Sequence, residues 1–161
     1  MQIKFKFKNI NSNSTGKFPV TAISVNRIEL YDDVVQHEIT LDFEPQEQNH
    51  LKIHFVNKQP EDTEVDSQGN IVGDVNFELE SISVDGEQFA EMLWEGCYYF
   101  NDQTIPGCLF FGPAGHYSLD FILPVLKWQL KTNHEKHNND PEWETDYNYY
   151  QRACQILESI K

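Results

Sequence analysis

Apolar and polar residues alternate one by one along most of this chain, and this pattern restricts the fold more than any other feature. Ile3, Phe5 and Phe7 alternate with lysines, and residues 50–55 repeat the pattern. Successive side chains of a β-strand point to opposite faces, so a period of two predicts strands with one buried and one wet face. The same reasoning predicts further strands at 39–43, 77–84, 98–100, 108–111 and 117–121.

Two segments carry an irregular form of the pattern. Residues 21–31 are predicted to form one strand, with a phase slip near Asn26 that we interpret as a bulge. The strand over 77–84 changes phase at Glu80-Ser81. Turn signals separate the candidate strands, and many short antiparallel strands with such turns predict a mostly β fold, an antiparallel β-sandwich or jelly roll. The turn signals are Thr15-Gly16, Gly69-Asn70, Asp85-Gly86, Gly112-Pro113 and Ala114-Gly115.

The period changes near the end of the sequence. A short helix is predicted near 124–131, with Val125, Trp128 and Gln129 on one side, and residues 132–141 are predicted to be a polar loop. An amphipathic helix is predicted near 141–160, either packed on the sandwich or its edge or used for docking. The division is therefore a β-sandwich domain over 1–131 and a polar loop with a C-terminal helix over 132–161. The apolar stripe that predicts this second helix consists of Trp143, Tyr147, Tyr150, Cys154 and Leu157.

The charge of the chain excludes some classes of partner. Its 161 residues include 12 Lys and Arg against 26 Asp and Glu, a formal net charge of −14. Nucleic acids and anionic membranes attract basic surfaces, so we expect neither as a partner. Residues 1–31 nevertheless carry net +4 and residues 32–161 net −18. Either the basic N-terminal strand meets an acidic surface, or its lysines protect an edge strand from unwanted pairing.

An acidic stretch over residues 61–70, followed by Asp74, is a candidate calcium site. Calcium takes six to eight oxygen ligands in flexible geometry, which clustered carboxylates can supply. If calcium binds, the ligands are expected to be Asp62, Asp66, Asp74 and Asp85. The alternative is a solvated hairpin tip that holds no ion.

Aromatic residues form a second candidate site. Aromatic rings bind sugar rings and anchor protein interfaces, so the predicted contacts to a glycan or a protein partner are Trp94, Tyr98, Tyr99 and Tyr117. The alternative is that these rings fill the core of the sandwich.

Catalytic motifs do not stand out in the sequence. There is no Gly-x-Ser-x-Gly elbow, and no carboxylate pair is distinguished as a glycosidase acid and base, so we predict a protein that is not an enzyme. Cys97 and Cys108 are interpreted as free thiols, although a disulfide across a hairpin would be the alternative. His50 and His54 fall on the wet side of their strand. No secretory signal and no apolar run near the roughly 20 residues of a membrane span are present.

Residues 50–131 resemble a known group of proteins. The shared motifs are Asn57-Lys58, Asp62-Thr63, Gly69 to Val72, Asp85-Gly86, Gly115 to Phe121, Pro124, and Trp128 to Leu130. They are similar to small phage-encoded proteins described as calcium-dependent, xylan-binding-type carbohydrate-binding modules. The resemblance implies a β-sandwich that holds calcium and sugar. Where the Gly-aromatic strand of such modules is expected to carry Trp, this chain has Tyr117.

These observations lead to three functional hypotheses. The first is a non-enzymatic phage structural or accessory module of a head, tail or fibre, located in the virion or the host cytoplasm and contacting virion proteins, other copies or host surface glycans. The second is a calcium-dependent carbohydrate-binding module. The third, suggested by the net charge alone, is an acidic inhibitor of a host basic protein.

Overall fold

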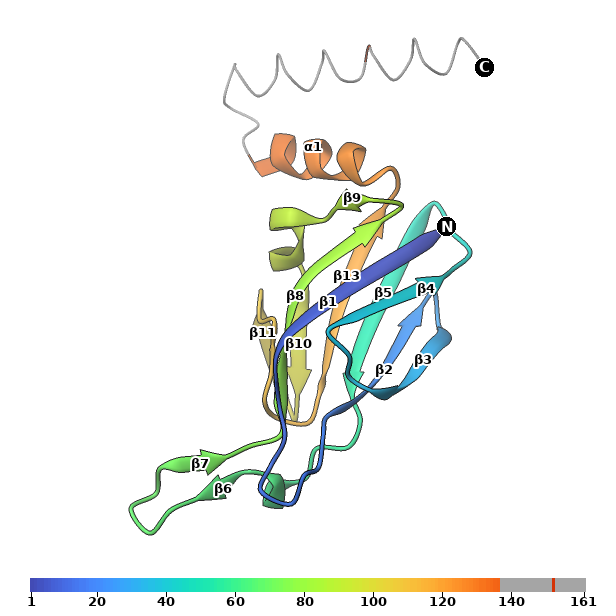
Figure 1. The fold of residues 1–161 in the computed structure, drawn as a ribbon. Coiled ribbons are helices and arrows are strands. Elements are labelled where there is room, and N and C mark those ends of the chain that lie inside the picture. Colours follow the sequence, from blue (N-terminus) through green and yellow to red (C-terminus); the bar gives the residue numbers. More distant parts are fainter. Residues whose placement is uncertain (137–151, 153–161) are drawn as a thin grey trace.

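Two antiparallel sheets packed face to face form the body of the protein (Figure 1). The computed structural model describes residues 1–136 and residue 152, so the helix predicted near 141–160 lies outside the described residues. Strands that the sequence places far apart pair in both sheets. The predicted antiparallel β-sandwich is therefore confirmed.

The strands divide unequally between the two sheets. The smaller sheet contains β1 (Gln2–Asn11), β4 (Glu38–Asp42), β8 (Asn76–Val84), β9 (Glu87–Gln88) and β12 (Phe110–Phe111). Its order is β12-β8-β1-β4, and β9 pairs with β8. The larger sheet contains β2 (Val20–Val25), β3 (Ile28–Val34), β5 (Gln48–Phe55), β10 (Cys97–Phe100), β11 (Gln103–Pro106) and β13 (His116–Ile122). Its order is β11-β10-β13-β5-β2-β3.

Short elements lie at the two ends of the sandwich (Figure 1). At one end a 3₁₀ turn, η1 (Pro60–Asp62), leads into a two-stranded hairpin that projects away from the sheets. The hairpin consists of β6 (Glu64–Val65) and β7 (Ile71–Gly73). At the opposite end lie η2 (Ala90–Glu95) and the helix α1 (Val125–Lys136).

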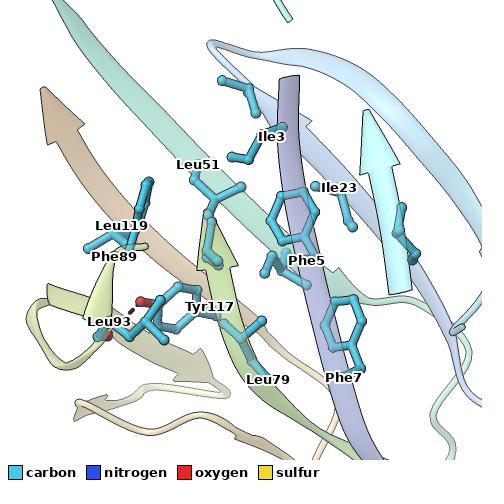
Figure 2. Packing of buried hydrophobic residues seen from close by; sticks show 14 of the residues in the cluster. Ile3, Phe5, Phe7, Ile23, Leu51, Leu79, Phe89, Leu93, Tyr117 and Leu119 are labelled. Carbon is cyan, nitrogen blue, oxygen red and sulfur yellow. Dashed lines mark hydrogen bonds between the residues drawn. The ribbon is translucent and has the colours of Figure 1, made fainter. Parts of the chain in front are cut away.

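The inner faces of the two sheets share one hydrophobic core (Figure 2). Ile3, Phe5 and Phe7 of β1 are all 2% exposed or less, and they pack in the same cluster as Leu51 of β5. These are the apolar members of the alternating segments, so the sequence predicted the buried side of both strands correctly. The wet positions between them remain at least partly exposed.

The phase change predicted at Glu80-Ser81 is a β-bulge. Lys6 of β1 pairs with Ser81, but the next residue, Phe7, pairs with Leu79, which leaves Glu80 as an extra residue. Because one extra residue reverses the direction of the following side chains, the buried positions move to Ile82. The bulge lets both halves of β8 bury their apolar side chains.

The prediction of one strand over 21–31 is wrong. The segment is a hairpin of β2 and β3, and Asn26 and Arg27 form its turn with φ values of 55° and 69°. Two residues with positive φ match the tight turn that suits the twist of a hairpin. The apparent phase slip marked this turn, which the sequence hides because Arg rarely occupies the left-handed region.

The lysines of the first strand do not protect a sheet edge, because β1 lies between β8 and β4. Lys4 forms an ion pair with Glu38 at 2.8 Å, and Lys8 lies 3.7 Å from Glu78. The acidic surface that the charge asymmetry suggested is therefore the chain's own pair of neighbouring strands. All four side chains are at least partly exposed, so each pair contributes at most about 1 kcal/mol.

The helix predicted near 124–131 exists but continues to Lys136, so residues 132–136 are not the loop that the sequence predicted. Val125 and Trp128 are buried, and Gln129 donates hydrogen bonds to the backbone oxygens of Gln88 and Phe89. The segment continues the helix because it has no Pro or Gly to stop it. Among the described residues, no helix is both long and apolar enough to cross a bilayer.

Candidate functional site

A cavity of about 350 Å³ opens at the end of the sandwich that carries the β6–β7 hairpin. Three separate segments meet there: the chain after β5, the turn between β10 and β11, and the loop between β12 and β13. Its lining consists of Lys58, Gln59, Pro60, Thr63, Asn101, Gly112, Pro113 and Ala114. We call this set the loop-end cavity.

A buried ion pair supports one wall of the loop-end cavity. The Lys58 ammonium is paired with the Asp74 carboxylate, and the two side chains are 6% and 16% exposed. Lys58 Nζ also donates to Thr63 Oγ1 at 3.1 Å and to the Val75 carbonyl at 3.0 Å. An ammonium has three protons, so all its donors are occupied. The Lys58 ammonium therefore holds the wall of the loop-end cavity in place through its contacts with Asp74, Thr63 and Val75.

Asp74 is also fully engaged. Its Oδ1 accepts a hydrogen bond from Thr63 Oγ1 at 2.8 Å, and its Oδ2 accepts one from Asn76 Nδ2 at 2.9 Å. Together with Lys58 these contacts link the start of β8 to the chain that follows β5. The carboxylate has the partners that a buried charge requires.

A second ion pair lies in the same region. Lys17 Nζ is 2.6 Å from Asp62 Oδ2, and Asp62 is 5% exposed. The Gln59 backbone N–H donates to Asp62 Oδ2 at 2.7 Å, and Asn13 Nδ2 donates to Oδ1 at 3.3 Å. Asp62 thereby ties η1 to the loop between β1 and β2.

The four aspartates predicted to bind calcium do not gather around one point. Asp62 and Asp74 each hold a different lysine, and Asp66 accepts hydrogen bonds from Gln68 and Asn70 within its own hairpin turn. Asp85 lies at the far end of β8, where its Oδ1 accepts from the Gln2 backbone N–H at 2.7 Å. Within the part of the chain that the structure describes, no three His, Cys, Asp or Glu side chains form a group that could hold a metal ion.

The four aromatic candidates separate into two groups. Tyr98 and Tyr117 are 0% exposed, so these rings belong to the core and not to a contact surface. Their hydroxyls donate to the carbonyls of Pro113 at 2.7 Å and Leu93 at 2.6 Å, and burial raises the pKa of both phenols. Figure 2 shows Tyr117 against Leu93. Strand geometry places Tyr98 and Tyr99 on opposite faces, but residues 97–100 are all apolar or aromatic, so no polar residue marks which face is wet.

Trp94 and Tyr99 are the candidate rings that reach the surface, with 60% and 38% of their area exposed. Tyr99 stacks on His116, with ring centroids 5.0 Å apart and an angle of 17° between the planes. Trp94 lies in η2, against Gly107. Neither ring lines the loop-end cavity. Cys97 and Cys108 are free thiols, as expected.

Sequence reasoning missed most of the residues around the loop-end cavity. Gly112-Pro113 and Ala114-Gly115 are predicted as turns, but no sequence pattern places them beside Gln59 or Asn101. One available signal was Asn57-Lys58 directly after a strong strand, since a strand that ends in polar residues often marks the start of a functional loop.

Buried Asp62 and partly buried Asp74 make the stability of the fold depend on pH in the acidic range. Burial raises the pKa of Asp62 and Asp74, but hydrogen bonds from Lys17 and the Gln59 backbone to Asp62, and from Lys58, Asn76 and Thr63 to Asp74, lower both pKa values overall. A lowered pKa stabilises the fold above the ordinary Asp value of about 4, and this contribution is lost as pH falls through the lower folded value.

We therefore expect the free energy of unfolding to fall steeply below about pH 4, which thermal melts at pH 6, 4 and 3 would measure. The Asp74→Asn variant should be less stable at pH 6 and lose less on acidification. Asp102→Asn, in the exposed turn after β10, serves as the control and should follow the parent protein. If the stability of Asp74→Asn and that of the parent fall in parallel with pH, Asp74 does not contribute to the pH dependence, which would contradict this prediction.

No protein-family model matches the sequence, and no curated protein matches it. A solved structure described as "vCBM60 in complex with galactobiose" is similar to 74% of this chain and to 97% of its own, with 12% identity and a TM-score of 0.46. At these values the comparison assigns no function, and the sandwich fold rests on the two sheets of the chain itself.

Proposed function

We propose that this protein is a non-catalytic glycan-binding module whose ligand occupies the loop-end cavity. The observation that carries the proposal is the chemistry of the lining, in which neutral polar side chains alternate with small apolar surfaces. A volume of about 350 Å³ falls in the range of about 300–1,000 Å³ that small-molecule sites occupy. The proposal keeps the glycan-binding part of the second functional hypothesis and departs from its calcium dependence.

The polar groups of the cavity suit a ligand rich in hydroxyls. The side-chain amides of Gln59 and Asn101 each offer both donors and an acceptor, which matches a hydroxyl group that also does both. Pro60, Pro113 and Ala114 offer apolar surface to the C–H face of a sugar ring. Such a mixture of apolar walls with a few oriented polar groups is typical of ligand sites.

The same lining supports binding in preference to catalysis. General acid–base chemistry needs a group that can exchange a proton with the substrate. The residues that line the loop-end cavity in the described part of the chain include no Asp, Glu, His or Cys, and the Lys58 ammonium is already held by three acceptors. A glycosidase would need two carboxyl groups at the scissile bond.

We also propose that glycan binding here requires no calcium. The buried carboxylates of Asp62 and Asp74 hold the ammonium groups of Lys17 and Lys58. A calcium ion would have to displace a lysine that is already in place. Binding is therefore expected to be the same in calcium and in a chelator.

Titration calorimetry with neutral β-linked disaccharides, such as galactobiose and xylobiose, tests the proposal. Asn101→Gly removes the amide but tolerates the φ of 48° at this position, and Gln59→Ala removes the other amide. Each should weaken binding by about 1 kcal/mol, roughly fivefold, because one hydrogen bond to the ligand is lost. Gln68→Ala at the hairpin tip is the matched control and should bind as the parent does.

The absence of binding across a panel of neutral glycans, or equal losses in Gln68→Ala and Gln59→Ala, would end this proposal. If a chelator abolishes glycan binding, the glycan site is supported but the proposal that binding requires no calcium is wrong.

One observation favours a second function, the phage structural module. The hairpin β6–β7 projects from the sandwich, and its Val65, Ile71 and Val72 are 61%, 65% and 66% exposed. Exposed apolar side chains on a protruding strand pair are a means of protein contact. If this function holds, mass spectrometry of purified phage particles will detect the protein. Replacing the three residues with Thr should then reduce the amount of the protein in the particles. The acidic-inhibitor hypothesis keeps only the net charge of −14 as support.

A further inference from the structure

The outer face of the larger sheet carries a group of basic side chains. His116 of β13 pairs in register with His54 of β5, and the ring centroids lie 6.3 Å apart at an angle of 87°. Tyr99 of β10 pairs with His116 on its other side and stacks on it. Lys52 lies two residues before His54 and therefore points to the same face. We call Lys52, His54 and His116 the basic triad.

The basic triad lacks the carboxylate partners that other basic groups of this chain have. His50, the next residue on the same face, has its Nδ1 2.7 Å from Asp120 Oδ1. Within the described residues no ion pair involves Lys52, His54 or His116. Lys4 and Lys8 of β1, Lys58 of the loop-end cavity and Lys17, in contrast, are paired with acids.

Apart from His116, the residues directly opposite Lys52 and His54 on the neighbouring strands are neutral, and the carboxylates of this sheet lie farther out. Ser118 and Ser24 flank Lys52 on the two neighbouring strands, and Ala22 lies opposite His54. The titratable groups on the surrounding strands are Cys97 and Tyr99 on β10, Asp120 on β13, His50 on β5, and Glu29 and Asp32 on β3, which lies one strand beyond β2. Two hydroxyls, two imidazoles and an ammonium thus surround one point of the sheet.

Like charges on the triad oppose one another. Burial and then Lys52 lower the pKa of His54, and burial followed by Lys52, His54 and His50 lowers the pKa of His116. A bound oxyanion would reverse this repulsion and accept charge-assisted hydrogen bonds from the ammonium and the imidazolium groups. The chain as a whole repels anions at net −14, so such a site must act at short range.

We propose that the basic triad binds the acid group of an anionic saccharide, a uronate or a sulfate ester, with Tyr99 as the aromatic wall beside the sugar. The saccharide nature of the ligand rests on the proposed function, but the site is separate, because none of these residues lines the loop-end cavity. At this second site the ligand class is an acidic sugar unit, whereas the loop-end cavity binds neutral sugar units.

The sign of the pH dependence follows from the histidines. His54 and His116 are neutral at pH 7.5, and they become protonated only below their lowered pKa values. The anion stabilises the protonated imidazoles, so binding takes up protons and the affinity rises as the pH falls. The acid group of a uronate remains ionised throughout the range from pH 7.5 to 5.

Titration calorimetry with trigalacturonate and with its neutral methyl ester, at pH 7.5 and 5 and fixed 0.15 M salt, tests the proposal. Trigalacturonate should bind at least tenfold more tightly at pH 5, and the difference should be absent for the ester. Galactose 6-sulfate tests the sulfate ester in the same way. Binding of either ligand that depends on pH supports the site and identifies which acid group it binds. In parallel, imidazole NMR signals of His54 and His116 should titrate at higher pH when the acid sugar is bound.

Lys52→Gln should lower the affinity for the acidic sugar at least tenfold at pH 5. Lys6→Gln, on the exposed face of the smaller sheet, is the matched control and should change nothing. Equal affinities at the two pH values, or equal effects of the two lysine variants, would overturn the proposal. Binding of neutral disaccharides in Lys52→Gln reports on the loop-end cavity alone, so failure of one site is distinguished from failure of the other.

Discussion

Replacing Lys58 with Met is expected to lower the free energy of unfolding by about 3 kcal/mol, one of the two largest effects of a single substitution in this protein. The change leaves Asp74 as a charged side chain that is 16% exposed and has lost its ammonium partner. It also removes a donor from Thr63 and from the Val75 carbonyl. Urea unfolding at pH 7 measures the loss of unfolding free energy. The m-value, which is the slope of that free energy against urea concentration, should stay constant.

Two comparisons make this expectation specific. Lys17→Met removes the partner of Asp62, but Lys17 is 32% exposed, so water replaces part of the lost interaction and the cost should be nearer 1 kcal/mol. The double variant Lys58→Met with Asp74→Leu should cost less than the sum of the single changes, because no charge remains buried. A loss below 1 kcal/mol for Lys58→Met would show that the pair does not hold the wall of the loop-end cavity.

Phe77→Ala should destabilise the protein by about 4 kcal/mol. Phe77 of β8 is 0% exposed, and its ring centroid lies 4.5 Å from that of Phe111, 5.1 Å from that of Phe55 and 5.6 Å from that of Phe7. These three rings come from different strands in both sheets, so they cannot move together to fill the space. The loss combines the transfer of a phenyl ring to water with the cavity that remains.

The control for this prediction lies in the strand beside it. Phe110 of β12 precedes Phe111 but is 44% exposed, so Phe110→Ala should cost less than about 1 kcal/mol. Thermal and urea unfolding of both variants give the comparison. Similar losses at the two positions would mean that the aromatic cluster around Phe77 is not the centre of the core.

Much of the fold could be predicted because its signal is local. The alternation around Phe5 and Ile53 identified which side chains are buried, and the phase change at Glu80-Ser81 marked the position at which the structure has the bulge of β8. The helix stripe of Val125 and Trp128 also identified a buried face correctly. In each case the spacing of apolar residues within one short segment was enough, since burial repeats with the geometry of the element.

Other elements carried no such signal. The strand β11 has the sequence Gln-Thr-Ile-Pro and exposes all four residues, so it lacks a buried face that alternation could reveal. It exists because the turn at Asn101 folds it back onto β10. The extra length of α1 was missed for a similar reason, because residues 132–136 are polar although helix-compatible.

The candidate sites were the least predictable part of the molecule. Asp62 and Asp74 were noticed as carboxylates, but their partners Lys17 and Lys58 come from other loops. Tyr98 and Tyr99 are adjacent in sequence, yet one is in the core and the other on the surface. A side chain's chemistry is visible in the sequence, but its neighbours are set by contacts between distant segments.

Alternation along the chain was enough to predict short antiparallel strands with one apolar face, because strand geometry ties the direction of a side chain to its position in the strand. Long-range pairing, in contrast, makes β1 an interior strand, brings lysines to Asp62 and Asp74, and places Lys52, His54 and His116 on one open face. Those arrangements depend on which strands pair and in what register, and register is fixed by the packing of the whole core.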